Sequence, residues 1–187
     1  MNKRVAIVIG STRPTRITAG IASWIRDELS SASELDYELL DLAEINLPFL
    51  DETFMAALGK YEHEHTVRWS EIVQSFDGYI FVFPQYNWGY PAVLKNALDF
   101  LYEEWSGKPA SFVTFGTRGG SRAAEQFATI LMGLHMKALD DHLEVVITKD
   151  HLDDNWQLND IDATLRPYAA QIQSINVEMS RALGEDN

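Results

Sequence analysis

Apolar residues are distributed along this chain in two alternating patterns. Short continuous runs of β-branched and aromatic residues are typical of strands buried on both faces of a parallel sheet. Such runs predict strands at residues 5–9, 37–42, 79–83 and 111–115, and a fifth within 136–148, where 143–148 fits best. Between these runs, apolar residues recur at intervals of three and four. This spacing predicts amphipathic helices over residues 17–29, 61–76, 90–101, 121–134 and 161–179.

Strands and helices therefore alternate along the chain. This alternation predicts a parallel sheet with helices on both faces, which is the doubly wound α/β architecture. A length of 187 residues suits one such domain, and the sequence contains no linker and no internal repeat. We therefore expect residues 1–187 to form a single domain.

The composition narrows the possible partners. The chain has 28 acidic and 15 basic side chains, a formal net charge of −13. A surface this acidic repels phosphate backbones and anionic bilayers, so we expect no nucleic-acid partner and no membrane insertion. Cysteine is absent, which excludes disulfides, thiolate metal sites and a cysteine nucleophile. Because no apolar stretch approaches the ~20 residues of a membrane span, and the N-terminal apolar run is too short for a signal peptide, we expect a soluble cytoplasmic protein.

Three unusual loops follow predicted strands, at the sheet edge where open α/β domains bind ligands. The first loop, residues 10–18, leads from a buried strand into a helix, whose free N–H groups and dipole favour an anion. Arg13 and Arg16 add positive charge, and further hydroxyl donors come from Ser11, Thr12, Thr15 and Thr18. The loop matches neither the P-loop nor the dinucleotide fingerprint. The alternative is an ordinary polar loop with a helix cap.

The second loop, residues 84–91, places three aromatic side chains between two prolines. Flat apolar faces beside backbone donors suit a planar heteroaromatic ligand, although the same rings could instead pack on the protein or on a partner subunit. The third loop, residues 116–121, is rich in glycine and allows close approach of its backbone to a ligand. Taken alone it could be an ordinary turn.

Together the three loops resemble the NADPH-dependent FMN reductase family, which has the flavodoxin-like fold. The first motif reads Gly10-Ser11-x-Arg13-x-x-x-x-Thr18, and the third reads Gly116-x-x-Gly119-Gly120-Ser121-x-x-Ala124-x-Gln126. The middle motif, residues 84–99, is long and specific. The resemblance runs from residue 5 to about residue 134. It implies a flavodoxin-like doubly wound sheet of five parallel strands in the order 2-1-3-4-5.

The resemblance also implies non-covalently bound FMN. The cofactor phosphate would be held by Ser11, Arg13, Arg16, Ile17 and Thr18. The isoalloxazine would be edged by Pro84, Gln85, Tyr86, Asn87, Trp88 and Gly89. The pyrimidine side or the nicotinamide site would be approached by Gly116, Arg118, Gly119 and Gly120. Family members are commonly homodimers or dimers of dimers, so a similar assembly is expected.

The implied activity is hydride transfer from NADPH or NADH, through FMN, to a flavin, quinone or azo compound in a ping-pong cycle. The flavin carries the chemistry, so no catalytic acid, base or nucleophile is assigned to the protein. Backbone N–H groups of Gly119 and Gly120 are expected to stabilise negative charge on the reduced ring. Two alternatives are a flavodoxin-type electron carrier and a flavin-binding redox sensor. Arg13 and Arg16 favour the enzyme, because flavodoxins bind phosphate mainly through hydroxyl and backbone groups.

Other polar clusters are given structural interpretations. His63 and His65 are too poorly aligned on a helix to share a metal ion, so we expect a solvated helix face and no metal site. Lys95 and Asp99 lie four residues apart and are expected to pair. Whether Asn96 supports the neighbouring loop cannot be decided from the sequence.

Overall fold

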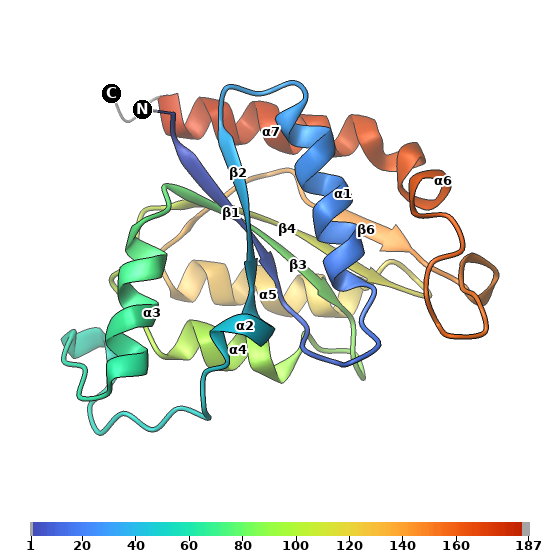
Figure 1. The fold of residues 1–187 in the computed structure, drawn as a ribbon. Helices are drawn as coiled ribbons and strands as arrows, with labels where there is room; N and C mark the ends of the chain where they lie inside the picture. The colour runs from blue at the N-terminus through green and yellow to red at the C-terminus, as the bar shows by residue number, and fades with distance from the viewer. Residues whose placement is uncertain (1, 185–187) are drawn as a thin grey trace.

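A computed structural model describes residues 2–184 and contains a central parallel sheet (Figure 1). The strands are β1 (Arg4–Ile9), β2 (Asp36–Asp41), β3 (Gly78–Pro84), β4 (Pro109–Gly116), β5 (Lys137–Ala138) and β6 (Leu143–Val146). They follow the order β2-β1-β3-β4-β5, and β6 also pairs with β4. Each of these pairings is parallel. The predicted doubly wound α/β fold and its strand order are confirmed.

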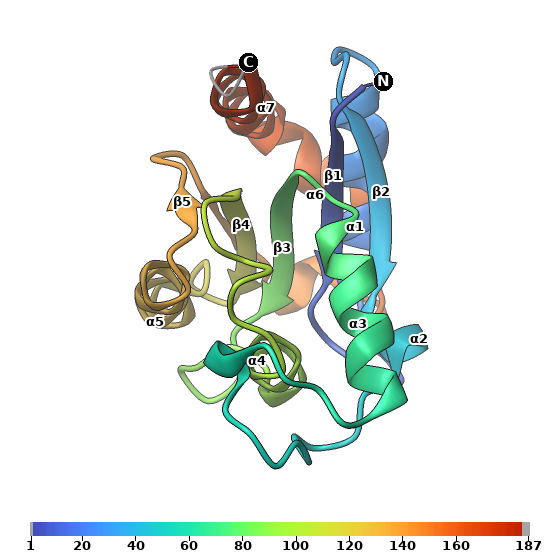
Figure 2. The same ribbon diagram turned by 90° about the vertical axis from the view of Figure 1, so that its left-hand side faces the viewer.

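Helices cover both faces of the sheet (Figures 1 and 2). One face carries α1 (Thr18–Ser30), α6 (Ile161–Leu165) and α7 (Ala169–Gly184), and the other carries α3 (Glu64–Gln74), α4 (Ala92–Asp99) and α5 (Ser121–Gly133). Successive residues of a strand point to opposite faces. In β3, Ile80 and Val82 enter the first core, whereas Phe81 and Phe83 enter the second. Because both faces are buried, the central strands are apolar throughout, as the sequence pattern predicts.

The fifth position of the sheet differs from the prediction of one strand. The two-residue strand β5 pairs with the start of β4, and β6 pairs with its end. Between them the chain leaves the ladder, and the hydroxyl of Ser111 donates to the carbonyl of Asp141 over 2.7 Å. The edge of the sheet is therefore shared by two short strands.

Several predicted boundaries also move. The final helix is interrupted at Arg166–Tyr168 by a 3₁₀ turn, because Pro167 supplies no N–H to the helical ladder. The strand expected at 37–42 ends at Asp41, whose carboxylate accepts the Ala43 N–H over 2.9 Å and caps α2 (Leu42–Ile45). Further 3₁₀ turns lie at Ala56–Leu58 and Lys149–His151.

Candidate functional site

The three loops singled out in the sequence meet at the carboxyl edge of the sheet, around a cavity of about 240 Å³. The predicted site residues that line it are Arg13, Arg16, Ile17, Thr18, Pro84, Gln85, Tyr86 and Gly116. Three further lining residues, Phe115, Thr117 and Ile147, were not among the predicted ones. Each of these three lies at or just beyond the end of β4 or β6, so the rule that ligands bind beyond strand ends could have located them.

The first loop begins at Gly10, where the chain leaves β1 under tight packing. A Cβ atom at this position would lie 3.1 Å from both a Leu94 methyl group and the carbonyl oxygen of Val82. Helix α1 then starts with no side-chain cap and no acidic residue in its first turn. Its first N–H groups are therefore left for a ligand, and they are oriented as an anion requires.

Two buried polar groups beside the cavity lack partners among residues 2–184. They are the Nε of Arg16 and the hydroxyl of Thr18. Arg16 directs another nitrogen to Asp41, at 2.5 Å from the carboxylate, whereas Arg13 is exposed. Buried donors are normally satisfied, so these unpaired groups at an uncapped helix start fit an anionic group such as a phosphate.

The second loop folds into a tight hairpin that was not foreseen. Tyr86 and Gly89 exchange backbone hydrogen bonds of 2.8 and 2.9 Å. Asn87 and Trp88, between them, have φ angles of 48° and 72°. Positive φ at both central positions is the geometry of a type I′ turn, which strongly favours glycine at the second. Tryptophan there is strained, and its indole is 68% exposed.

Contacts on two sides hold this hairpin in place. The hydroxyl of Tyr86 lies 2.9 Å from the hydroxyl of Ser11, which ties the hairpin to the first loop. On the other side, the Gln126 amide donates to the carbonyl of Trp88 over 3.2 Å, and the Arg122 guanidinium lies 5.6 Å from the indole centroid. The exposed indole is therefore carried by a fixed backbone.

The third loop is shaped by two glycines with positive φ. Gly119 and Gly120 have φ angles of 77° and 89°. A Cβ atom at Gly120 would lie 2.5 Å from the hydroxyl oxygen of Thr114, so no side chain fits there. Both glycines are buried next to the cavity without lining it, and the Arg118 side chain is exposed outside it.

The remaining predicted residues also lie just outside the cavity lining. Ser11 is buried behind Tyr86, and the hairpin residues Asn87, Trp88 and Gly89 extend beyond the opening. Tyr90 directly follows the hairpin. Burial raises the pKa of its phenol to about 12, so this phenol is neutral at physiological pH. The structure therefore gathers the three loops at one place, with the hairpin at the edge of that place.

A long segment between α2 and α3 carries an exposed apolar surface, which we call the apolar loop. It consists of Phe49, Leu50, Phe54, Met55 and Leu58, with Phe49 85% and Met55 70% exposed. Asn96 of α4 fixes the start of this loop, since its amide donates to the Pro48 carbonyl and its oxygen accepts the Leu50 N–H. Asn96 therefore supports the neighbouring loop, a role that the sequence alone could not decide. The expected pairing of Lys95 with Asp99 is confirmed at 2.6 Å.

The two histidines at the start of α3 do not form the solvated helix face that was expected. His63 precedes the helix, and its ring stacks on that of His65 with 5.2 Å between centroids. Both rings contact Asp51, His63 at its carbonyl and His65 at its carboxylate. Within residues 2–184, no group of three metal-ligating side chains is arranged to hold a metal ion.

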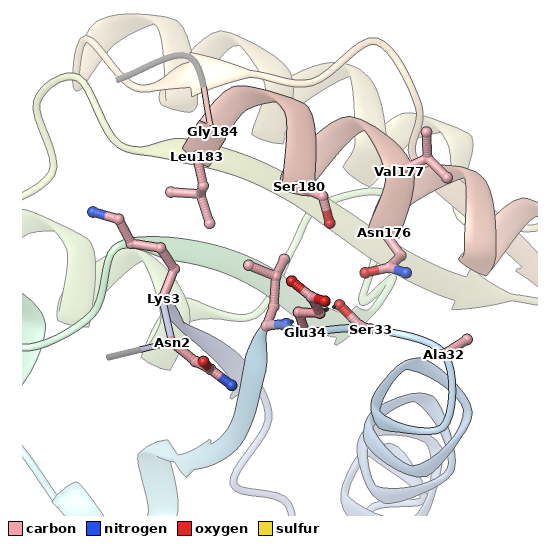
Figure 3. A pocket seen from close by; sticks show the side chains of 11 residues that line it. Asn2, Lys3, Ala32, Ser33, Glu34, Asn176, Val177, Ser180, Leu183 and Gly184 are labelled. Atoms are coloured by element: carbon pink, nitrogen blue, oxygen red, sulfur yellow. Dashed lines mark hydrogen bonds between the residues drawn. The ribbon is translucent and has the colours of Figure 1, made fainter. Parts of the chain in front are cut away.

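A second cavity of about 600 Å³ opens at the opposite, amino edge of the sheet (Figure 3). It lies between the end of α7 and the segments that precede β1 and β2. None of the predicted site residues lines it.

Across residues 2–184, the helices are too short or too polar to cross a bilayer.

Comparison with known proteins gives a consistent picture. The model of the family described as NADPH-dependent FMN reductase matches residues 3–150. The chain is 40% identical over 147 residues to an NAD(P)H-dependent FMN reductase of Saccharomyces cerevisiae, covering 73% of this chain and 77% of that protein. It is also 40% identical over 134 residues to an NAD(P)H-dependent FMN reductase of a Nectria species, covering 68% and 67%. Its fold resembles that of the flavoenzyme NAD(P)H:(acceptor) oxidoreductase of Paracoccus denitrificans, with a TM-score of 0.72, 19% identity and coverage of 96% and 98%.

Proposed function

The chain belongs to the NADPH-dependent FMN reductase family, and from this premise we propose that it passes hydride from NAD(P)H through FMN to a quinone, azo compound or free flavin in a ping-pong cycle. It is an NAD(P)H-dependent oxidoreductase with FMN as its cofactor. The observation that carries the proposal is the cavity at the carboxyl edge, where an uncapped helix start meets unpaired donors of Arg16 and Thr18.

The first loop is assigned to the FMN phosphate. N–H groups at the start of α1 would donate to phosphate oxygens together with the hydroxyl of Thr18. Arg13, exposed at the opening and without a carboxylate partner among residues 2–184, would supply charge, as would the free edge of Arg16. Ser11 would act on the phosphate only indirectly, because its hydroxyl is hydrogen-bonded to the hydroxyl of Tyr86. The remaining first-loop residue, Ile17, lines the cavity.

The second and third loops are assigned to the ring system. Backbone groups and side chains of residues 84–89 would edge the isoalloxazine, with Pro84, Gln85 and Tyr86 in the cavity wall. In the third loop, the Gly119 N–H already donates to the Gly116 carbonyl over 3.1 Å. The donor assigned to the pyrimidine side is therefore the N–H of Gly120. FMN itself supplies two-electron hydride chemistry when bound, so the protein's task is to bind, orient and shield it.

The proposal is tested on the purified 187-residue chain. After reconstitution with FMN, anaerobic addition of NADPH should bleach the yellow absorption, and 2-methyl-1,4-naphthoquinone should restore it. Double-reciprocal plots with both substrates varied should give parallel lines. FMN that stays bound but is bleached by neither NADPH nor NADH would instead support an electron carrier. Intersecting lines would contradict the ping-pong cycle.

We further propose that two copies of the chain associate through the apolar loop. Monomeric proteins rarely display so many large apolar side chains together, and hydrogen bonds to Asn96 hold the start of this surface in place before any partner arrives. Sedimentation of the wild type should therefore give a dimer or a multiple of it. Phe49→Asp with Met55→Asp should shift the mass to that of a monomer. Met132→Asp, at an exposed apolar position on α5, is the matched control, and an equal shift there would contradict the assignment.

A further inference from the structure

The hairpin after β3 presents an aromatic ring paired with a cation. The Trp88 indole is 68% exposed, and the Arg122 guanidinium lies 5.6 Å from its centroid. An indole that is covered by an arginine on one side and exposed on the other keeps an accessible aromatic face. Such a face stacks with planar aromatic molecules.

The backbone that carries this ring is preorganised. It is strained at a φ of 72°, and the two backbone hydrogen bonds of the hairpin maintain that conformation. Gln126 holds the Trp88 carbonyl at 3.2 Å, while its amide oxygen would lie 3.3 Å from a Cβ atom at Gly89. Strain of this kind persists where the surrounding structure enforces it, and a ring on a fixed backbone loses less entropy when a ligand stacks on it than one on a mobile loop.

Two arginines, Arg118 and Arg122, and two carboxylates, Glu125 and Glu144, lie at or near the start of α5 in a chain that carries −13 overall. Arg118 and Arg122 flank the start of α5, and Arg118 has no ion pair among the described residues. Arg122 pairs with Glu125 at 3.2 Å, but both side chains are more than half exposed, so this pair is weak. The other nearby carboxylate, Glu144, packs on Gly119 and faces His142 at 3.6 Å. An exposed arginine without an ion-pair partner among the described residues attracts anions to its own position on an otherwise acidic surface.

We propose that Trp88, Arg118 and Arg122 form a recognition platform for electron acceptors that are planar aromatic compounds bearing an anionic group, such as a sulfonate or carboxylate. The aromatic body stacks on the exposed indole, and the anionic group lies within the field of the two guanidinium groups. Trp88 is the contact residue, and Gln126 is a positioning residue. The inference rests on the proposed reductase function and specifies its acceptor.

A matched pair of acceptors tests the platform kinetically. We compare 1,4-naphthoquinone-2-sulfonate with neutral 1,4-naphthoquinone in the FMN-loaded protein, with NADPH as donor. Arg122→Gln should lower the ratio of kcat/KM for the sulfonate to that for the neutral quinone about threefold, and the double variant with Arg118→Gln should lower this ratio about tenfold. Arg122→Lys should restore most of the preference. Arg68→Gln, another exposed arginine with a helical glutamate partner, is the control and should change neither rate.

A binding measurement separates this inference from the proposed function. Titration calorimetry with 2-naphthalenesulfonate, which cannot be reduced, should show weaker binding in the double variant, and 2-naphthalenemethanol should bind equally to both proteins. Equal sulfonate binding would overturn the platform even if quinone turnover is high. A raised KM for NADPH with an unchanged sulfonate preference would overturn it as well, because the arginines would then serve the dinucleotide. Failure of the wild type to reduce either quinone would contradict the proposed function, and the calorimetric result would still decide the platform.

Discussion

The guanidinium of Arg16 and the carboxylate of Asp41 lie 2.5 Å apart, both largely buried beside the cavity. Asp41 comes from the end of β2, and its other oxygen caps α2. Arg16 therefore reaches the cavity already neutralised by a neighbour, with its Nε still unpaired. Any phosphate bound there must share this arginine with a carboxylate, which repels it.

Asp41→Asn should lower the stability of the FMN-free protein and raise its affinity for FMN. The amide keeps the cap on Ala43 but removes the counter-charge of a partly buried arginine, which should cost the FMN-free protein about 1–2 kcal/mol. FMN should bind about tenfold more tightly, because its phosphate becomes the counter-ion. Denaturant unfolding and fluorescence titration measure the two quantities. Asp27→Asn, which removes an exposed partner of Arg26, is the control. An equal loss of stability with and without FMN would contradict the assignment.

Arg13→Ala should weaken FMN binding. Loss of one charge-assisted contact with the phosphate is expected to cost about 1.5–3 kcal/mol, roughly a tenfold to hundredfold higher Kd. Thermal stability of the FMN-free protein should stay unchanged, since Arg13 is exposed. Titration of flavin fluorescence measures the change, with Arg26→Ala as the matched variant. An unaltered Kd would remove Arg13 from the phosphate site.

Gly120→Ala should destabilise the third loop. The new Cβ atom combines a φ of 89° with a contact of 2.5 Å to Thr114, for a total of about 2–4 kcal/mol. Adding Thr114→Ala removes the steric part and should recover about half of the loss. Gly133→Ala, where a Cβ atom meets nothing within 4 Å, should be neutral or stabilising. Unfolding curves of the wild type and these three variants measure the changes, and the assignment fails if Gly120→Ala and Gly133→Ala behave alike.

Trp88→Gly should stabilise the folded protein but slow its turnover of planar acceptors. Glycine relieves the strain at φ 72° and gives the Asn-Gly pair preferred in type I′ turns, which is expected to contribute about 0.5–1 kcal/mol. Turnover of planar acceptors should fall about threefold to tenfold, because the stacking surface is lost. Trp156, exposed with a φ of 61° in another loop, supplies the control. Trp156→Gly should also be stabilising yet leave acceptor kinetics unchanged.

Lys108 should make stability depend on pH. Burial lowers the pKa of this amine to about 8, below its ordinary value of 10.5. Between these two values the unfolded chain binds more protons than the folded one, so the free energy of unfolding rises with pH. Because the ammonium is partly exposed, we expect a gain of about 1 kcal/mol between pH 8 and 9.5. Lys108→Met should lose this dependence, and a slope equal to that of the wild type would refute the assignment.

Much of the fold and the position of the site follow from local sequence patterns. Continuous apolar runs located the central strands, and the rule for open α/β sheets brought the loops after β1, β3 and β4 to one edge. Residues such as Arg13 and Gly116 could be placed there because they lie beside those strand ends. The expected homodimer and the single-domain organisation stay predictions, as do the roles of individual site residues.

What could not be predicted depends on contacts between distant segments. The pairing of Arg16 with Asp41 joins residues 25 apart in the sequence, and the anchoring of the apolar loop by Asn96 joins residues 46 apart. The hairpin at Tyr86 lacks the glycine that signals a type I′ turn, so its geometry is imposed by Ser11 and Gln126. Near His63 a helical face was assumed, although the helix begins one residue later.

If two copies associate through the apolar loop as proposed, the net charge of the chain makes their encounter sensitive to ionic strength. Two copies that each carry −13 repel one another over distances longer than the contact itself. In dilute buffer this repulsion acts across tens of ångströms, whereas at about 0.15 M salt the Debye length shrinks to about 8 Å. The apolar contact has no such range and is little affected by salt at these concentrations. The proposed association should therefore be slower in dilute buffer than at about 0.15 M salt, so ionic strength would set its rate.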